Sequence, residues 1–168
     1  QRRSINVRKW AFREMKPIII IAIAVVCSVV TVGLLLTQTT QTDTLSQECS
    51  GTARCITGTM TQVIDGDTLK IDGQSIRFAL SSAPELDESG GIKSKEFIEN
   101  ICPVGSTVLV DEDDGQVQGS YGRIIGVVYC NGVNLNEELA GSEFGYLTSE
   151  FCGSSEFKTH DWARKYGC

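Results

Sequence analysis

The chain reads Val63-Ile-Asp-Gly-Asp-Thr-Leu-Lys-Ile-Asp-Gly-Gln-Ser-Ile-Arg-Phe78 in the middle of its sequence. In this stretch the Asp72-Gly73 pair separates two runs, 68–71 and 75–81, in which apolar and polar residues alternate. Alternation with a period of two predicts a half-buried strand, and Asp-Gly between two such runs is a strong signal for a hairpin turn. Together with a preceding strand over 56–63, the stretch predicts a β-meander.

Two more strands and three helices are predicted after the meander. The strands cover 107–110 and 124–129, and the helices cover 92–101, 134–140 and 155–166. The first helix is indicated by apolar residues at helical spacing, the second by an asparagine cap at Asn134 or Asn136, and the third by a cap at Ser155. Five strands with inserted and trailing helices fit a small Greek-key barrel, so we predict a mainly β or α+β, OB-fold-like domain with about three helices.

The N-terminal part of the sequence predicts a membrane anchor. The run Pro17–Leu36 carries no charged side chain and has about the twenty residues that a helix needs to cross a bilayer. Six bases against one acid in residues 1–16 favour a cytoplasmic N-terminus. The predicted order is a basic cytoplasmic segment (1–16), a transmembrane helix (17–36), a flexible Thr/Gln/Ser-rich stalk (37–54) and an extracytoplasmic domain (55–168). A cleaved secretory signal is the alternative, and it would change only the tether.

Cysteine usage agrees with export. Six cysteines lie outside the apolar run: Cys49, Cys55, Cys102, Cys130, Cys152 and Cys168. An even number in an exported domain predicts three disulfides, whose pairing the sequence leaves open. We favour one pair, Cys152 with Cys168, because these two bracket the last predicted helix. A zinc site is less well supported, because no CxxC pair exists and His160 is the single histidine.

The net charge of −6 conceals a difference between the two sides of the predicted membrane. Residues beyond the apolar run hold nine bases and twenty acids, a net charge of −11. Nucleic-acid binding depends largely on contacts between basic residues and phosphates, so this charge argues against tight, extended binding. A local site, where arginines and a cation reverse the field, remains compatible with it.

Three polar motifs lie along the predicted barrel, and each has an ordinary structural explanation. The Asp65-Gly66-Asp67 turn satisfies loop amides in many proteins. Arg77 follows Ile76 in a predicted strand and therefore points to the opposite face, toward either the outer surface or a polar pocket. Glu85 and Arg123 lie in loops, where charged residues are common.

Taken together, these motifs resemble the staphylococcal nuclease-like family, also called thermonucleases, over Cys55–Cys168. The family pattern has an Asp-Gly-Asp-Thr turn, a strand arginine, a Thr-Pro-Glu loop and a Tyr-Gly-Arg loop. Here the corresponding elements are Asp65-Gly-Asp-Thr68, Arg77, Ala83-Pro-Glu85 and Tyr121-Gly-Arg123, and Asn136-Glu137 matches the family's Asn-Glu helix start. The ordered set, with its internal spacing, is far more specific than any one motif.

The resemblance implies hydrolysis of phosphodiester bonds in DNA, RNA or both. Arg77 and Arg123 would clamp the phosphate, because a planar guanidinium binds two oxygens at once and stays protonated. Such fixed cations stabilise the charge that develops on the phosphoryl group in the transition state. Glu85 would be the general base that activates water, and Tyr121 would hydrogen-bond a substrate phosphate.

The same resemblance implies a Ca²⁺ site. Asp67 would ligate the ion, Asp65 would hold metal-bound water, and Ala83 would contribute its backbone carbonyl. The family's second anionic ligand is an aspartate, and this chain has Ser82 at that position. Replacing a carboxylate by a hydroxyl weakens calcium binding unless water, a nearby acid such as Asp87 or another metal compensates.

The sequence therefore predicts a monomeric, calcium-dependent endonuclease domain outside a membrane. One alternative is a nucleic-acid-binding or scaffold module that keeps the barrel but has lost turnover, as Ser82 and the acidity suggest. A second is a protein-interaction domain that uses the acidic run Asp111–Asp114, which we otherwise interpret as a solvated loop. Phe157 and Trp162 are predicted to be core residues, and His160 a surface or helix-packing residue.

Overall fold

The computed structural model describes residues 49–168. The predicted cytoplasmic segment, the transmembrane helix and residues 37–48 of the stalk lie outside the described residues. Within residues 49–168 no helix has the length and apolar character needed to span a membrane.

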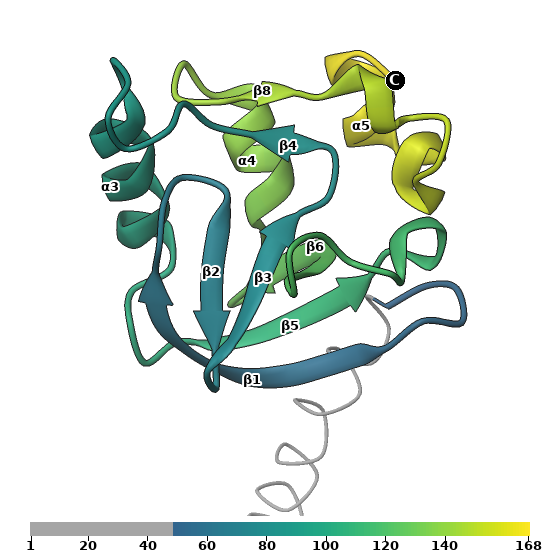
Figure 1. The fold of residues 1–168 in the computed structure, drawn as a ribbon, viewed down its shortest axis with the longest axis horizontal. Helices are drawn as coiled ribbons and strands as arrows, with labels where there is room; N and C mark the ends of the chain where they lie inside the picture. The colour runs from purple at the N-terminus through teal and green to yellow at the C-terminus, as the bar shows by residue number, and fades with distance from the viewer. Residues whose placement is uncertain (1–48) are drawn as a thin grey trace, which may run out of the picture. The chain divides into compact units, whose positions relative to one another are not determined.

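Five strands close into a barrel, and Figure 1 shows their arrangement. They are β1 (Cys55–Val63), β2 (Thr68–Ile71), β3 (Gln74–Phe78), β5 (Thr107–Glu112) and β6 (Ile124–Cys130). Antiparallel pairing runs in the order β3-β2-β1-β5-β6, and a parallel pairing of β3 with β6 closes the barrel. Strand β1 pairs with β5 as far as Thr59 and with β2 from Met60 onward. Its register with β2 shifts between Met60 and Gln62, and such a bulge lets a strand bend. The predicted five-stranded barrel is confirmed, and it is consistent with an OB-like fold.

The hairpin turns follow from their sequences. Asp72 and Gly73 have φ values of 47° and 87°, and Asn131 and Gly132 have 52° and 81°. Two consecutive residues with positive φ form the tight turn whose twist matches a β-hairpin, and Asp-Gly and Asn-Gly are its preferred pairs. The first turn joins β2 to β3 as predicted, and the second joins β6 to the short strand β7 (Val133–Asn134).

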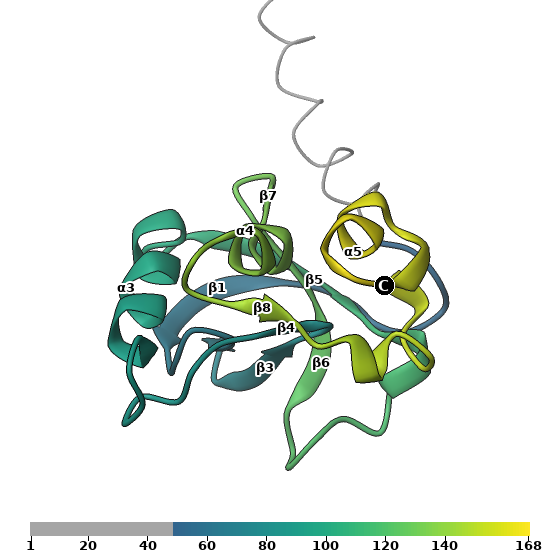
Figure 2. The ribbon, with the colours of Figure 1, turned by 90° about the horizontal axis from the view of Figure 1, so that it is seen from above.

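Three α-helices cover one side of the barrel: α3 (Gly91–Ile101), α4 (Leu135–Gly141) and α5 (Asp161–Tyr166). In Figures 1 and 2, α3 and α5 lie on opposite sides of α4. Helix α4 contacts β6 and the short strands β4 (Ser81–Ser82) and β8 (Tyr146–Leu147). The Asn134 side chain caps α4 by accepting a hydrogen bond from the Glu137 amide at 3.1 Å. Asn134 is one of the two residues predicted as the possible cap.

Two apolar clusters hold these layers together. The first fills the barrel and includes Met60, Leu69, Ile76 and Val128, which are fully buried. The second lies between β6 and α5, and here Phe157 and Trp162 are buried with Val127. The prediction that Phe157 and Trp162 are core residues is confirmed.

Two predicted elements are broken in the structure. The strand expected over 75–81 ends at Phe78, because Leu80 has a positive φ of 60° and redirects the chain into β4, which pairs with β8 in a separate two-stranded sheet. The helix expected over 155–166 is a 3₁₀ turn, Glu156–Thr159, followed by α5, because His160 is extended. The predicted cap at Ser155 is present, and the His160 ring packs edge-on against Phe157.

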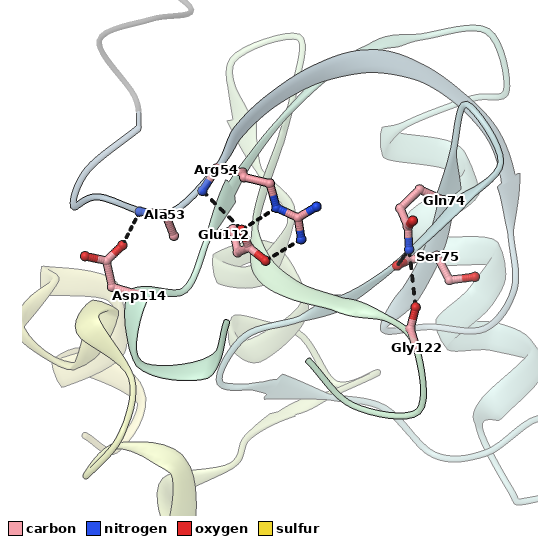
Figure 3. Close-up of polar contacts among 7 residues, drawn as sticks. All are labelled: Ala53, Arg54, Gln74, Ser75, Glu112, Asp114 and Gly122. Carbon is pink, nitrogen blue, oxygen red and sulfur yellow. Dashed lines mark hydrogen bonds and ion pairs between the residues drawn. The ribbon is translucent and has the colours of Figure 1, made fainter. Parts of the chain in front are cut away.

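The acidic run is not a solvated loop. Strand β5 continues through Asp111 and Glu112, and these two residues and Asp113 are at most 3% exposed. Glu112 forms a two-pronged contact with Arg54, with both nitrogen–oxygen distances at 2.7 Å (Figure 3). Asp111 accepts hydrogen bonds from Ser50, and Asp114 accepts them from the amides of residues 52 and 53. The run therefore fastens residues 49–54 to the barrel.

Three disulfides pair the six cysteines: Cys49 with Cys55, Cys102 with Cys130, and Cys152 with Cys168. The predicted use of all six and the favoured last pair are confirmed. The second disulfide joins the end of α3 to the end of β6, and both of its cysteines are fully buried in the barrel core. The other two join chain segments near the two ends of the described region.

We predict that Glu112→Gln destabilises the domain in a pH-dependent way. The hydrogen bond from Arg54 holds the pKa of Glu112 below its ordinary value of 4.5, more strongly than burial raises it. A carboxylate with a lowered pKa adds stability above its ordinary pKa and loses that stability as the pH falls through the folded-state value. The difference in urea midpoint between wild type and variant should therefore be largest near neutral pH and shrink below about pH 4.5.

The control for this experiment is Asp87→Asn, because Asp87 is an exposed loop residue. Its urea midpoint should follow that of the wild type at every pH. A difference between wild type and Glu112→Gln that stays constant down to pH 3 would contradict the assigned role of the ion pair.

Candidate active site

A pocket of about 360 Å³ brings together three of the predicted site residues, Arg77, Glu85 and Arg123. Arg77 comes from β3, Glu85 from the loop after β4, and Arg123 from the position just before β6. Gln116, Ser120 and Phe151 form part of the remaining wall. Two basic residues and one acidic residue therefore line one cavity outside the barrel.

The strand alternation explains why Arg77 reaches this pocket. Its neighbours Ile76 and Phe78 are 0% and 2% exposed and point into the barrel, so the arginine points outward. It enters a polar pocket rather than lying on the open surface, and 24% of its side chain is exposed. There its guanidinium forms an ion pair with Asp67 and donates a hydrogen bond to the Ser82 hydroxyl at 2.5 Å.

Asp67 is buried at the start of β2, with 2% exposure. Its Oδ1 pairs with Arg77 and accepts a hydrogen bond from the Thr68 hydroxyl at 3.0 Å. Its Oδ2 accepts one from the Ala83 amide at 2.8 Å. Both carboxylate oxygens are thus engaged, and they connect β2, β3 and the end of β4.

The turn before Asp67 is shaped by glycine and by helix α3. Asp65 accepts a hydrogen bond from the Asp67 amide at 3.0 Å, which closes the turn. A Cβ atom at Gly66 would overlap the Ser94 hydroxyl and the Ala83 side chain, so only glycine fits between α3 and β4. The Ser94 hydroxyl is fully buried and has no hydrogen-bond partner among the described residues.

Arg77 is subject to opposing electrostatic effects from its neighbours. Burial lowers the pKa of Arg77, the positive charge of Arg123 lowers it further, and Asp65 and Glu85 oppose this. A neighbouring charge of the same sign shifts a pKa in this way only at short range. An anion placed between the two guanidinium groups would relieve their repulsion.

A tight turn positions Arg123 and Tyr121. Tyr121 and Gly122 have φ values of 51° and 76°, and residues 120 and 123 exchange backbone hydrogen bonds. Gln74 donates a hydrogen bond to the Gly122 carbonyl at 3.3 Å, which joins this turn to the start of β3 (Figure 3). Tyr121 lies at the tip, 98% exposed, with the Arg123 guanidinium 5.9 Å from its ring centre. It is next to the pocket-lining arginine but is not itself part of the wall.

Glu85 lies on the pocket wall and is exposed to solvent, while hydrogen bonds hold its backbone in place. Its amide donates a hydrogen bond to the Glu88 side chain at 3.0 Å, and its carbonyl accepts one from the Glu88 amide at 2.9 Å. A Cβ atom at Gly91 would overlap the Glu85 carbonyl, so the start of α3 also packs on this loop. The residue predicted to be the general base therefore lies on a turn that Glu88 and the start of α3 hold in place.

The residues predicted to hold calcium fit a divalent cation poorly. Asp67 is the one buried carboxylate among them, and its two oxygens already have partners. Ser82 accepts its hydrogen bond from Arg77, and Asp65 uses Oδ1 within its own turn. Within residues 49–168, no three acidic, histidine or cysteine side chains gather in a way that could hold a metal ion. Calcium prefers six to eight oxygen ligands, several of them anionic, and this set does not supply them.

Asn136 is a positioning residue that the sequence did not identify as such. Its buried amide group donates to the carbonyls of Ala79 and Gly126, and its oxygen accepts from the Val128 amide at 3.0 Å. The Ser81 hydroxyl donates to its backbone carbonyl at 2.8 Å. These bonds tie the segment that carries Ser82 and Glu85 to β6. The Asn136-Glu137 match was the only signal in the sequence, and it indicated a helix start rather than this network.

Comparison with known proteins gives one distant relative. No protein-family model matches the chain. An uncharacterized protein of Bacillus anthracis is 27% identical to it over 106 residues, which cover 57% of this chain and 49% of that protein. The chain thus spans about half the length of this relative, whose description states no activity.

We predict that Asn136→Ala lowers the free energy of unfolding by about 2–4 kcal/mol, because it removes hydrogen bonds from three backbone groups, the carbonyls of Ala79 and Gly126 and the amide of Val128. Urea unfolding would measure the change. The matched control is Asn100→Ala on the exposed face of α3, which should change stability by less than about 0.5 kcal/mol. Equal midpoints for the two variants would contradict the assigned network.

We also predict that Tyr121→Asn stabilises the domain by about 1 kcal/mol, because asparagine tolerates positive φ and Asn-Gly is the preferred pair for this turn. Tyr121→Phe keeps the same backbone cost and should leave the thermal midpoint unchanged. A Tyr121→Asn variant no more stable than the wild type would show that the tip stores no strain.

Proposed function

We propose that this chain is a phosphodiesterase of the staphylococcal nuclease-like type, which cleaves DNA, RNA or both. The single observation that carries the proposal is the placement of Arg77, Glu85 and Arg123 on the wall of one pocket. These residues come from three separate segments of the chain. The resemblance, which rests on the sequence alone, assigns all three to one site.

The barrel supports the same proposal. Its pairing order, closed by the parallel contact of the third strand with the last, agrees with an OB-fold Greek-key barrel. OB-fold barrels commonly bind oligonucleotides. The distant relative neither strengthens nor weakens the proposal, because its description names no activity.

The chemistry follows from the three side chains. Arg77 and Arg123 bind the non-bridging oxygens of a phosphodiester and stabilise the charge that builds up on them. Glu85 accepts a proton from the attacking water while the water oxygen forms a bond to phosphorus. The bond from phosphorus to the leaving oxygen breaks, and that oxygen takes a proton from solvent. Arg123 also donates a hydrogen bond to this oxygen as its charge develops.

The cellular setting is part of the proposal. Three disulfides among 49–168 suit an oxidising compartment, in agreement with a domain held outside a membrane by residues 17–36. The partner is a nucleic acid that enters the pocket locally, and the domain acts as a monomer. Calcium dependence stays a prediction of the resemblance, and no step above depends on it.

A second candidate function is a binding module without turnover. It is favoured by the hydrogen bond from Arg77 to Ser82 and by the ion pair with Asp67, which hold part of the guanidinium in place. Such a module would bind single-stranded nucleic acid through the same arginines and leave it intact.

The test is cleavage of fluorescent single-stranded DNA and RNA by the full chain in detergent micelles. Arg77→Gln and Arg123→Gln should each lower the rate by about 10²–10³-fold, and Glu85→Gln by about 10²–10⁴-fold. Lys158→Gln, an exposed cation in the 3₁₀ turn after Ser155, is the matched control and should retain the wild-type rate.

The two candidate functions give different results in this assay. Binding by the wild type without cleavage, lost in Arg77→Gln, would replace the enzyme by the binding module. Neither binding nor cleavage would eliminate both.

A further inference from the structure

We infer that the guanidinium group of Arg77 is the resident cation between Asp67 and Ser82, so that the negative charge of Asp67 is neutralised without a divalent metal. The inference about the cation rests on the contacts of these three side chains. Its consequence, phosphodiester cleavage without calcium, rests in addition on the proposed function.

The contacts account for every side chain that the resemblance made a metal ligand. Arg77 pairs with Asp67 through one terminal nitrogen and donates to Ser82 through the other. The second oxygen of Asp67 accepts from the Ala83 amide, whose own carbonyl the resemblance made a ligand. The guanidinium thus contacts both side chains between which the resemblance places the ion.

Charge balance favours this arrangement over a metal. Asp67 is buried and carries one negative charge, which one guanidinium neutralises. A buried charge without a partner is strongly unfavourable, so Arg77 and Asp67 stabilise each other. A divalent cation between these two side chains would contact one carboxylate only, because Ser82 provides a neutral hydroxyl where a carboxylate would have been a second anionic ligand. Position 82 therefore determines which cation the site accepts.

The geometry leaves Arg77 able to bind substrate at the same time. A guanidinium carries several N–H donors in one plane, and two terminal nitrogens serve Asp67 and Ser82. Arg77 also lines the pocket that Arg123 and Glu85 share. A phosphate can approach this face without displacing the arginine from Asp67. A metal ion bound to both Asp67 and Ser82 would have to displace it.

Thermal unfolding of the full chain in detergent micelles tests the inference without any nucleic acid. The midpoint is measured in EDTA and in about 10 mM CaCl₂, above the roughly 10⁻³ M at which weak extracellular calcium modules bind. Sodium chloride keeps the ionic strength equal. The wild-type midpoint should agree within about 1 °C between the two conditions, because an ion that does not bind the folded protein does not change its unfolding temperature.

Variants supply the opposite case. Arg77→Gln combined with Ser82→Asp removes the internal cation and restores a second carboxylate, so calcium should raise the midpoint by roughly 4 °C at about tenfold its dissociation constant. Should this variant fail to fold, a cycle with Arg77→Gln, Asp67→Asn and both together serves instead. Removing both partners should lower the midpoint by less than the sum of the two single changes.

The inference is overturned if calcium raises the wild-type midpoint and Asp67→Asn abolishes that rise. It is also overturned if the cycle is additive. A calcium effect that persists in Asp67→Asn arises elsewhere in the chain and supports the inference. Failure of the proposed function appears separately, as an absence of cleavage in both EDTA and calcium, and it leaves the thermal result to decide the cation.

Discussion

The carboxylate of Asp67 is the group on which the site depends. It is buried at the junction of β2, β3 and β4, and it contacts Arg77, the Thr68 hydroxyl and the Ala83 amide. A buried charge must be matched by opposite charge and hydrogen bonds, so each of these contacts has to form when the domain folds. The position of Arg77 in the pocket is therefore a consequence of core electrostatics.

Buried acids organise a second part of the domain. Asp111, Glu112 and Asp113 are nearly inaccessible, and their charges are used to hold residues 49–54 and the 3₁₀ turn after Ser155. Their carboxylates bind within the fold instead of facing solvent. Glu112 is paired with a cation, Arg54, whereas Asp111 and Asp113 accept hydrogen bonds from neutral amide and hydroxyl groups.

Much of the barrel was predictable because its signals are local. Asp72-Gly73 and the alternation on both sides of it specify a hairpin, and the same alternation places Arg77 on the face opposite Ile76. The end of β3 was not predictable in this way. The continuation through residues 79–81 has strand-like alternation, but the Asn136 network and the pairing of β4 with β8 redirect it, and these are tertiary contacts between distant residues. The candidate site was predictable as a set of residues from their order. The engagement of Asp67 and Ser82 by Arg77 was not, because it depends on side-chain packing across three segments.

The parallel pairing of β3 with β6 has a consequence for how the pocket comes into existence. It joins Ile76 to Ile124 and Arg77 to Ile125, residues that are far apart in the chain. Contacts of long sequence separation carry a large loop-closure entropy and form slowly in folding. Arg77 and Arg123 lie on the two sides of this seam, so a chain that has formed only its first three strands has one arginine of the pair without the other. The pocket that Arg77 and Arg123 share can therefore appear only once the barrel has closed.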